Sequence, residues 1–425
     1  MKKITMSAVA LTAIMGSFSS VSAADGINIL DDLVLDGQIR PRYEFVDDGN
    51  SAHENANAMT ARTKLKVTGK LLNVDGLTAS VGIISVNNFG SHDYNWNGTN
   101  YSDDGKPYAV VMDPQKAIIS NAAVNYKVGD TLLHAGRGQV NLDNQRFIGT
   151  VGWRQLERSY DSVFVANNSI KNLSVLAAWV YGFQGVVDAP TADTNTVLLN
   201  VAYTVMPELK VTAYDYMIAN THDTYGIALT GNVKMDAVKL NYRAEYAQQS
   251  DPSMEIHEDG KKDVKVDADY YNLDLGVNVS GIIAGVNYEY LSGKSLTDSS
   301  GETKTFTTPL ATAHKFNGWA DQFLKTPTGG LIDTNVRLGY KAKGFGKLLA
   351  IYHDFTSDED MSDGKGGTTD DLGSEIDVVY VNKVPGVNGL TGMLKYADYS
   401  NGDVTGHTND VQKFWAMLDY KFSIK

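Results

Sequence analysis

The segment from Thr60 to Leu71 alternates between two kinds of residue, in the manner of a β-strand with two different faces. One set consists of Ala61, Thr63, Leu65, Val67, Gly69 and Leu71, and the other of Arg62, Lys64, Lys66, Thr68 and Lys70. Successive side chains of a strand point to opposite faces, so this strand has an apolar face and a basic face. The pattern recurs along the chain without helices to cover a sheet, which predicts a closed barrel with apolar faces toward lipid and charged faces toward a lumen.

The first 23 residues have the layout of a secretory signal peptide. Lys2 and Lys3 precede a mostly apolar stretch from Ile4 to Met15, and Val21-Ser22-Ala23 offers a small-residue cleavage site. The mature chain is then expected to cover residues 24–425. Without Lys2 and Lys3 it has 35 basic and 50 acidic residues, a net charge of −15. This acidity argues against nucleic acid as a partner.

The composition suits a membrane barrel better than a soluble domain or a helical membrane protein. The 425 residues include 40 glycines and 23 tyrosines but only 9 prolines. After residue 24 no apolar run approaches the ~20 residues of a spanning helix. The chain has no cysteine, which excludes disulfides, thiolate metal sites and cysteine nucleophiles.

Alternation predicts an all-β, up-and-down antiparallel transmembrane barrel of about 18 strands, with 16 as the alternative. The strand pattern is clearest at 33–45, 60–71, 173–183, 238–249 and 411–424. Connections after odd-numbered strands are mostly long and polar: 47–57, 87–115, 140–158, 184–195, 250–264, 292–333, 357–373 and 400–410. Connections after even-numbered strands are mostly short, as expected for periplasmic turns opposite long outer loops. Pro41 lies within the first strand, where a bulge would fit its missing N–H.

Two loops resemble segments of bacterial outer-membrane porins of the alginate-export-like and major-outer-membrane-porin types. They read G-R-G-Q-V-N-L-D-N-Q-R-F-I-G-T-V-G-W-R-Q from Gly136 to Gln155 and T-P-L-A-T-A-H-K-F-N-G-W-A-D-Q-F from Thr308 to Phe323. The resemblance implies an 18-stranded barrel, passive transport of small solutes and loops folded inward to narrow the pore. We therefore expect loops 140–158 and 292–333 to enter the lumen.

Charged residues fall on the faces that should line the lumen. The predicted pore-lining set is Arg40, Arg42, Glu44, Arg62, Lys64, Lys66, Arg243, Glu245 and Arg337. Opposed basic and acidic walls create a transverse field that sets ion preference. The predicted constriction residues are Asp143, Arg146 and Arg154 in the first loop and His314, Asn317, Trp319 and Asp321 in the second. The basic residues argue for anions and the acidic loops for cations, so the sequence leaves the preference open.

Metal binding has only a weak candidate, and no cofactor is expected. Acidic residues crowd one predicted loop, where Asp358, Asp360 and Asp363 could offer oxygen ligands to Ca²⁺. Their spacing does not match the helix-loop-helix calcium motif. A solvated acidic loop, bridged to lipopolysaccharide by divalent ions, is the simpler interpretation.

The sequence favours an outer-membrane porin for ions and small hydrophilic solutes over three alternative functions. An enzyme would need a nucleophile, a base and an orienting group together, whereas the adjacent His353 and Asp354 point to opposite faces of a strand. An adhesion or structural barrel would need only exposed loops. A dedicated exporter of an anionic polysaccharide would suit a basic lumen, although Glu44 and Glu245 interrupt it. Expected partners are outer-membrane lipid, lipopolysaccharide and the solutes; monomer and homotrimer both remain open.

Overall fold

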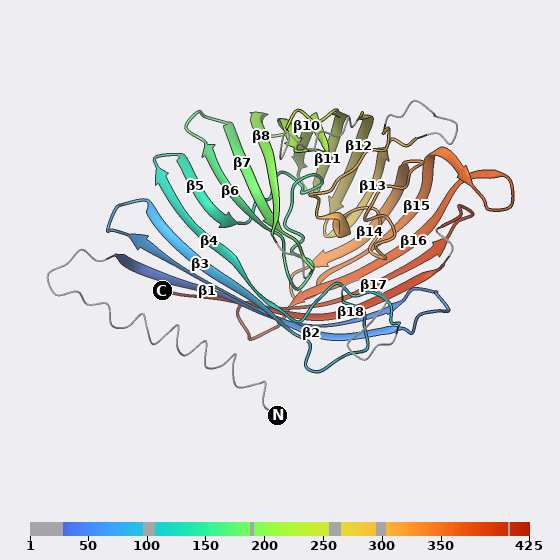
Figure 1. The fold of residues 1–425 in the computed structure, drawn as a ribbon, viewed down its shortest axis with the longest axis horizontal. Helices are drawn as coiled ribbons and strands as arrows, with labels where there is room; N and C mark the ends of the chain where they lie inside the picture. The colour runs from blue at the N-terminus through green and yellow to red at the C-terminus, as the bar shows by residue number, and fades with distance from the viewer. Residues whose placement is uncertain (1–28, 97–106, 188–190, 255–264, 295–302, 407–408) are drawn as a thin grey trace.

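The structure, a computed structural model, describes residues 29–96, 107–187, 191–254, 265–294, 303–406 and 409–425. Within these ranges the chain forms one 18-stranded antiparallel sheet in which β1 also pairs with β18, so the sheet closes into a barrel (Figure 1). The predicted β-barrel is confirmed. The expected signal peptide, residues 1–23, lies outside the described residues.

The strands follow one another around the barrel in chain order, apart from the closing pair. They are β1 (Leu30–Asp47), β2 (Ala56–Leu71), β3 (Leu77–Asn87), β4 (Ala117–Val128), β5 (Thr131–Gly138), β6 (Ser159–Asn167), β7 (Leu173–Gln184), β8 (Ala192–Met206), β9 (Leu209–Ile218), β10 (His222–Met235), β11 (Val238–Ser250), β12 (Asp267–Val279), β13 (Ile282–Leu291), β14 (Leu331–Ala342), β15 (Gly346–Ser362), β16 (Thr368–Lys383), β17 (Leu390–Asn401) and β18 (Val411–Ile424). A short 3₁₀ helix, η2 (Ala313–Lys315), lies between β13 and β14. No helix among the described residues combines the length and the apolarity needed to cross a membrane.

The seam between β1 and β18 gives the terminal strands their hydrogen-bonding partners. β1 pairs with β18 on one side and with β2 on the other. The bulge expected at Pro41 is not observed, because Pro41 lies opposite Ala61 in regular register. The irregularity between these strands falls instead between Asp31 and Val34.

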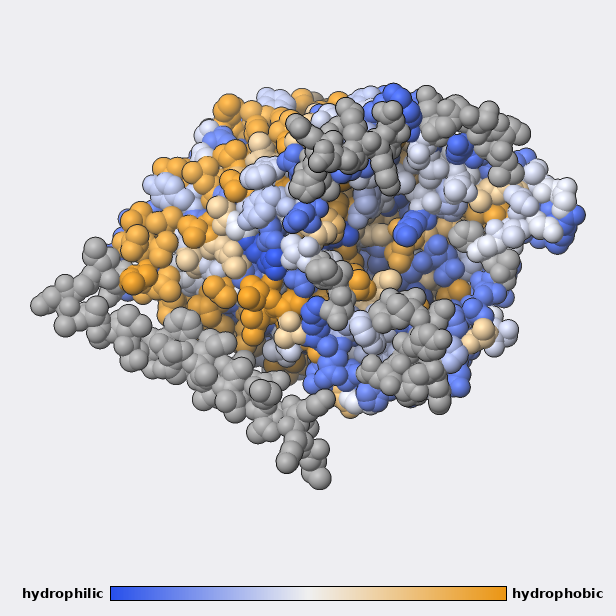
Figure 2. All heavy atoms as spheres, in the orientation of Figure 1, coloured by the Kyte–Doolittle hydropathy of each residue, from blue (hydrophilic) through white to orange (hydrophobic). Residues whose placement is uncertain are grey.

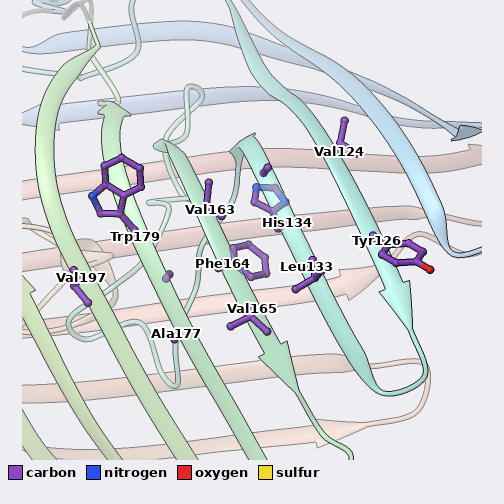
Figure 3. A pocket seen from close by; sticks show the side chains of 12 residues that line it. Val124, Tyr126, Leu133, His134, Val163, Phe164, Val165, Ala177, Trp179 and Val197 are labelled. Atoms are coloured by element: carbon purple, nitrogen blue, oxygen red, sulfur yellow. The ribbon is translucent and has the colours of Figure 1, made fainter.

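The outward faces of the strands are apolar and exposed, whereas the inward faces carry polar and charged side chains, the reverse of a soluble protein. On β14 the outward Val336 and Leu338 are 50% and 63% exposed, whereas the inward Asp333 and Asn335 are 1% and 8% exposed. Figure 2 shows apolar residues gathered over the outer side of the barrel around β4 to β7. Figure 3 shows part of this surface, a shallow apolar groove across β4 to β8 lined by Val163, Val165 and Trp179. An outer surface of this kind fits contact with lipid chains.

Some expected connections are shorter than the sequence pattern indicated. The expectation of a loop at 357–373 is wrong, because β15 continues to Ser362 and β16 begins at Thr368, leaving only residues 363–367 between them. The expected loop 184–195 is also shortened, since β8 begins at Ala192. Met361 pairs with Thr369 beyond the acidic segment. Backbone pairing can extend a hairpin into water without apolar faces, so alternation does not mark its end.

We expect a lysine on the outward face to destabilise the barrel and a lysine on the adjacent inward face to be tolerated. Val336→Lys places a charge in the lipid-facing band, at an expected loss of about 2–4 kcal/mol of folding free energy in a bilayer. Asn287→Lys, on the lumenal face of the paired strand β13, is the matched control. Urea unfolding in phospholipid vesicles would measure both. Equal losses would contradict the assignment of the two faces.

Candidate functional site

The connection between β5 and β6, residues 139–158, crosses the inside of the barrel; we call it the first inward loop. The Arg154 guanidinium donates to Glu44 on β1 (3.1 Å), and the Arg146 guanidinium donates to Glu289 on β13 (2.8 Å). Asp143 forms an ion pair with Arg243 on β11. β1 and β13 are separated in the barrel by several strands in either direction. The loop is therefore anchored to well-separated parts of the lumenal wall.

The connection between β13 and β14 also enters the barrel, and we call its described part, residues 303–330, the second inward loop. The backbone N–H groups of Trp319 and Ala320 donate to Glu375 on β16 (2.5 and 2.7 Å). Asp321 accepts from the Lys413 ammonium on β18 (2.9 Å). Gly318 has a positive φ of 82°, and an added Cβ would lie 2.3 Å from Glu375 Oε2. Only glycine allows the backbone this close to the wall.

The two inward loops bind each other through their backbones and through one threonine. Gly149 N–H donates to the Leu310 carbonyl (2.8 Å), and Thr312 N–H donates to the Gln145 carbonyl (3.1 Å). The Thr312 hydroxyl in turn accepts from Val151 N–H (3.1 Å). A Cβ on Gly149 would lie 2.3 Å from Thr312 Oγ1. The loops therefore form one partition across the lumen.

An apolar core inside the barrel adds to this partition. Phe147 of the first loop has its ring centroid 5.2 Å from Tyr270 of β12 and 5.9 Å from Phe306 of the second loop. Phe323 of the second loop lies 4.6 Å from Phe355 of β15. Aromatic pairs at these distances contribute beyond their buried area. The loops are packed like a protein interior, so they narrow the lumen as a fixed structure.

His314 connects the second loop to the wall at the centre of the partition. Its Nδ1 lies 2.5 Å from Asp321 Oδ1, and the Lys395 ammonium of β17 donates to its Nε2 (2.7 Å). An acceptor at Nε2 leaves Nδ1 to carry the proton, as in neutral imidazole. Burial lowers the pKa of His314 to about 3. His314 is therefore neutral at physiological pH.

Asp321 carries the negative charge of this junction. Burial alone would raise the pKa of its carboxyl, but His314, the Lys413 ammonium and the Arg154 guanidinium hold it well below the usual range. Arg154 donates to Asp321 across the two loops (3.0 Å). Asp321 thus ties the first loop and β18 to the second loop.

Three tryptophans surround the Lys395 ammonium. Its nitrogen lies 3.8 Å from the ring centroid of Trp319, 4.3 Å from that of Trp153 and 5.1 Å from that of Trp415. Aromatic faces stabilise a cation electrostatically when it is desolvated. The rings come from both loops and from β18, so this cage holds the partition to the wall.

The inward charges of β1 fasten the first loop to the wall. Arg40 donates to the backbone carbonyls of Gly152 (2.8 Å) and Arg154 (2.5 Å). Arg42 pairs with Asp113 and with Glu44. Arg42 and Glu44 are each 1% exposed. The expectation that Arg42 and Glu44 line the open lumen is therefore corrected: the loop covers them.

Four basic residues of the predicted pore-lining set, Arg40, Arg62, Lys64 and Lys66, line a cavity of about 760 Å³ beside β1 to β5. We call it the basic cavity; its charged lining residues are Arg40, Arg62, Lys64, Lys66, Lys421, Asp36, Glu157 and Asp419. Arg62 and Lys64 both pair with Glu157 of the first loop. The Lys66 side chain makes no ion pair or hydrogen bond within the described part of the chain, so its charge is available to a solute.

A second cavity of about 420 Å³ lies beneath the second loop, beside β11 to β15. We call it the amide cavity, because its lining includes Asn144, Asn272, Asn287, Asn317 and Asn335. Arg243 and Arg337, which were predicted to line the pore, also line this cavity and are paired with acids. Arg243 contacts Glu245 (2.7 Å), and Arg337 donates twice to Asp274 (2.6 and 2.9 Å). Trp319 and Asn317, predicted as constriction residues, also line this cavity.

The calcium candidate is not supported. Asp358 and Asp360 lie within strand β15, and Asp363 lies in the tight connection after it. Asp358 accepts from Gly293 N–H (2.9 Å), while Asp363 accepts from two backbone N–H groups of its own turn. Over the described ranges no group of three histidine or acidic side chains is placed to hold a metal. Asp360 accepts from the Thr368 hydroxyl (3.2 Å), so each of the three carboxylates has its own hydrogen-bond donor within the fold.

Several residues that shape the partition were not singled out from the sequence. On the wall they are Glu289, Asp333, Glu375, Asp377, Lys395 and Lys413, and in the connections they are Asp113, Gln155 and Glu157. The wall residues share the inward phase of their strands, so strict alternation would have found them. Asp113 and Glu157 lie in connections without periodicity, and no sequence signal places them.

Solved structures with the same architecture match nearly the whole chain. OccAB4 of Acinetobacter baumannii superposes with a TM-score of 0.70 at 16% identity, covering 93% of this chain and 99% of that one. OccK8 (OprE) of Pseudomonas aeruginosa gives 0.67 at 15% identity, covering 93% and 99%. OpdK of the same organism, solved with vanillate, gives 0.69 at 12% identity, covering 93% and 100%. At these identities the likeness establishes the fold. No family profile and no curated protein matches the sequence.

Acid should loosen the junction between the inward loops. The pKa of His314 is lowered to about 3 in the docked loop and would be about 6.5 in an undocked one. Between these two pKa values the docked loop binds fewer protons than the undocked loop. Its stability is therefore complete above pH 6.5 and declines as the pH falls toward 3. The ratio of docked to undocked loop falls by up to about tenfold per pH unit in this range. We expect single-channel current fluctuations to increase from pH 7 to pH 4.

His314→Gln is the control for this expectation, because an amide can bond Asp321 and Lys395 without titrating. Its fluctuations should change little over the same range. If the variant and the natural chain respond equally to acid, His314 is not the group responsible.

Proposed function

We propose that this chain is an outer-membrane porin that gives ions and small hydrophilic solutes passive passage. The single observation that carries the proposal is a lipid-facing closed barrel whose lumen is narrowed by a fixed partition yet keeps two polar cavities. A purely structural barrel has no need of such a partition. A dedicated enzyme would require an assembled nucleophile, base and orienting group.

The charge of the basic cavity favours anions. Its lining has five basic side chains, Arg40, Arg62, Lys64, Lys66 and Lys421, against three acidic ones, Asp36, Glu157 and Asp419. Excess positive charge in a confined, low-dielectric passage raises the local concentration of anions. The wall of β1 and β2 therefore selects for small anions rather than serving only as a solvated surface.

The surroundings of the barrel follow from the same proposal. The solved structures that resemble the chain are Occ-type porins, which supports placement in a bacterial outer membrane with lipid and lipopolysaccharide as neighbours. Membership of the alginate-export-like or major-porin type remains a prediction from the two loops. Export of an anionic polysaccharide is less favoured, because the partition is packed and the wall residues Arg62 and Lys64 are already paired with Glu157 of the first inward loop.

Single-channel conductance of the refolded mature protein in a planar bilayer tests the proposal. A salt gradient gives a reversal potential whose sign reports ion preference. We expect discrete conductance steps and a potential on the anion side. A correctly folded barrel that shows no steps would exclude an open porin and favour an adhesion barrel or a gated exporter.

Lys66→Gln should shift the reversal potential toward cations. The Lys66 side chain faces the basic cavity without a partner among the described residues. Neutralising it therefore changes the electrostatic field in the cavity without breaking an ion pair or a hydrogen bond. Triple neutralisation with Arg62 and Lys64 should shift it further, but would also release Glu157. Lys365→Gln, on the exposed β15–β16 turn, is the matched control. An equal shift in both variants would mean that surface charge, rather than the basic cavity, governs selectivity.

A further inference from the structure

The amide cavity differs chemically from the basic cavity. Its cationic groups Arg243 and Arg337 are paired with Glu245 and Asp274 on the wall. Its acids are likewise occupied: Glu289 accepts from Arg146 (2.8 Å), and Asp333 lies 2.9 Å from His353 Nδ1. A third cation of the lining, Lys315, donates to the Asn144 carbonyl (2.8 Å) rather than to an acid. Most of the charge that lines the cavity is therefore compensated.

Three of its amide side chains are less committed. The Asn272 side chain makes no hydrogen bond within the described part of the chain, and it lies in the cavity lining. The Asn335 amide donates to Asp333 Oδ1 (3.1 Å) and, at 3.4 Å, to Asn287 Oδ1; the Asn287 amide donates to the Leu273 carbonyl, also at 3.4 Å. At 3.4 Å a hydrogen bond is weak. Asn272 and Asn287 therefore retain donor and acceptor capacity, and Asn335 retains its carbonyl oxygen as an acceptor.

The register of three strands places these amides together. Asn287 of β13 lies opposite Asn335 of β14, and Asn272 of β12 lies opposite Glu289, two residues along β13 from Asn287. All three share the lumenal face. The Arg337 guanidinium lies flat across Gly285, where a Cβ would be 2.6 Å from its central carbon. All three amides line the cavity, with Asn272 and Asn335 largely buried in its wall.

The second loop adds aromatic surface to the same cavity. Phe316 and Trp319 are among its lining residues, and both are only partly buried. Each ring already has a cation over one face, Arg146 over Phe316 (4.8 Å) and Lys395 over Trp319 (3.8 Å), so the other face is the one that a solute could contact. Its volume of about 420 Å³ lies in the lower part of the range for small-molecule sites. Amide groups that donate and accept hydrogen bonds, beside aromatic rings and among mostly compensated charges, match a small ring-shaped solute with many hydroxyl groups.

We propose that the amide cavity is a subsite for uncharged polyhydroxylated solutes of mono- or disaccharide size. The proposal rests on the proposed porin function, since the solute must reach the cavity through the lumen. Hydroxyl groups would exchange hydrogen bonds with Asn272, Asn287 and Asn335, while a sugar face lies against the Trp319 or Phe316 ring. The barrel would then offer separate binding surfaces to anions and to neutral polyols.

Modulation of the ion current by maltose tests this subsite. Maltose added to one side of a bilayer holding the natural full-length mature chain should reduce the mean current with a saturable concentration dependence. The double variant Asn272→Leu, Asn335→Leu should raise the half-blocking concentration about tenfold, as expected for lost hydrogen bonds. Asn272→Ser serves as a milder variant, with an expected change of a few-fold in the same direction.

Lys66→Gln is the matched control, because it lies in the basic cavity; it should shift the reversal potential and leave the maltose dependence unchanged. Conductance steps without saturable block of the natural chain would overturn the subsite while leaving the porin proposal intact. Equal block of the natural chain and the double variant would also overturn it, since the effect would then come from the bulk solution. Absence of conductance steps would overturn both proposals.

Discussion

The pairing of every backbone polar group in a medium without water is the constraint on which this structure depends. A strand edge left open to lipid would leave unpaired N–H and C=O groups, so the sheet has to close on itself. The β1–β18 seam provides that closure. Closure in turn creates an inside and an outside for each strand. The apolar residues then belong on the outside, and the wall has room for charges only on the inside.

Charges on the inside need partners, and in this barrel the loops supply many of them. Arg40 and Arg42 would be costly to bury alone; the carbonyls of the first loop and Asp113 satisfy them. Glu375 similarly accepts from backbone N–H groups of the second loop. The wall and the loops therefore stabilise each other, and the shape of the lumen depends on ion pairs as much as on the barrel itself.

Much of the fold could be predicted from the sequence, because a two-residue period relates each strand residue directly to one face. Alternation placed Arg62, Lys64 and Lys66 on the lumenal face of β2, where the structure has them. It could not show that Arg42 and Glu44 lie beneath a loop, since covering depends on contacts between residues more than 100 positions apart. Asp113 and Glu157 lie in irregular connections, where no period exists. Alternation also does not mark the acidic end of β15 as a strand, because polar residues continue a hairpin as readily as they end one.

The junction at Asp321 has a consequence for how the barrel assembles. Asp321 contacts Arg154 of the first inward loop and Lys413 of β18, the last strand. Its partners are therefore complete only after β18 has been added. Without β18, Asp321 would be buried without the Lys413 ammonium, and the loss of one partner from a buried ion pair is strongly unfavourable. Full docking of the second inward loop therefore depends on the strand that closes the seam.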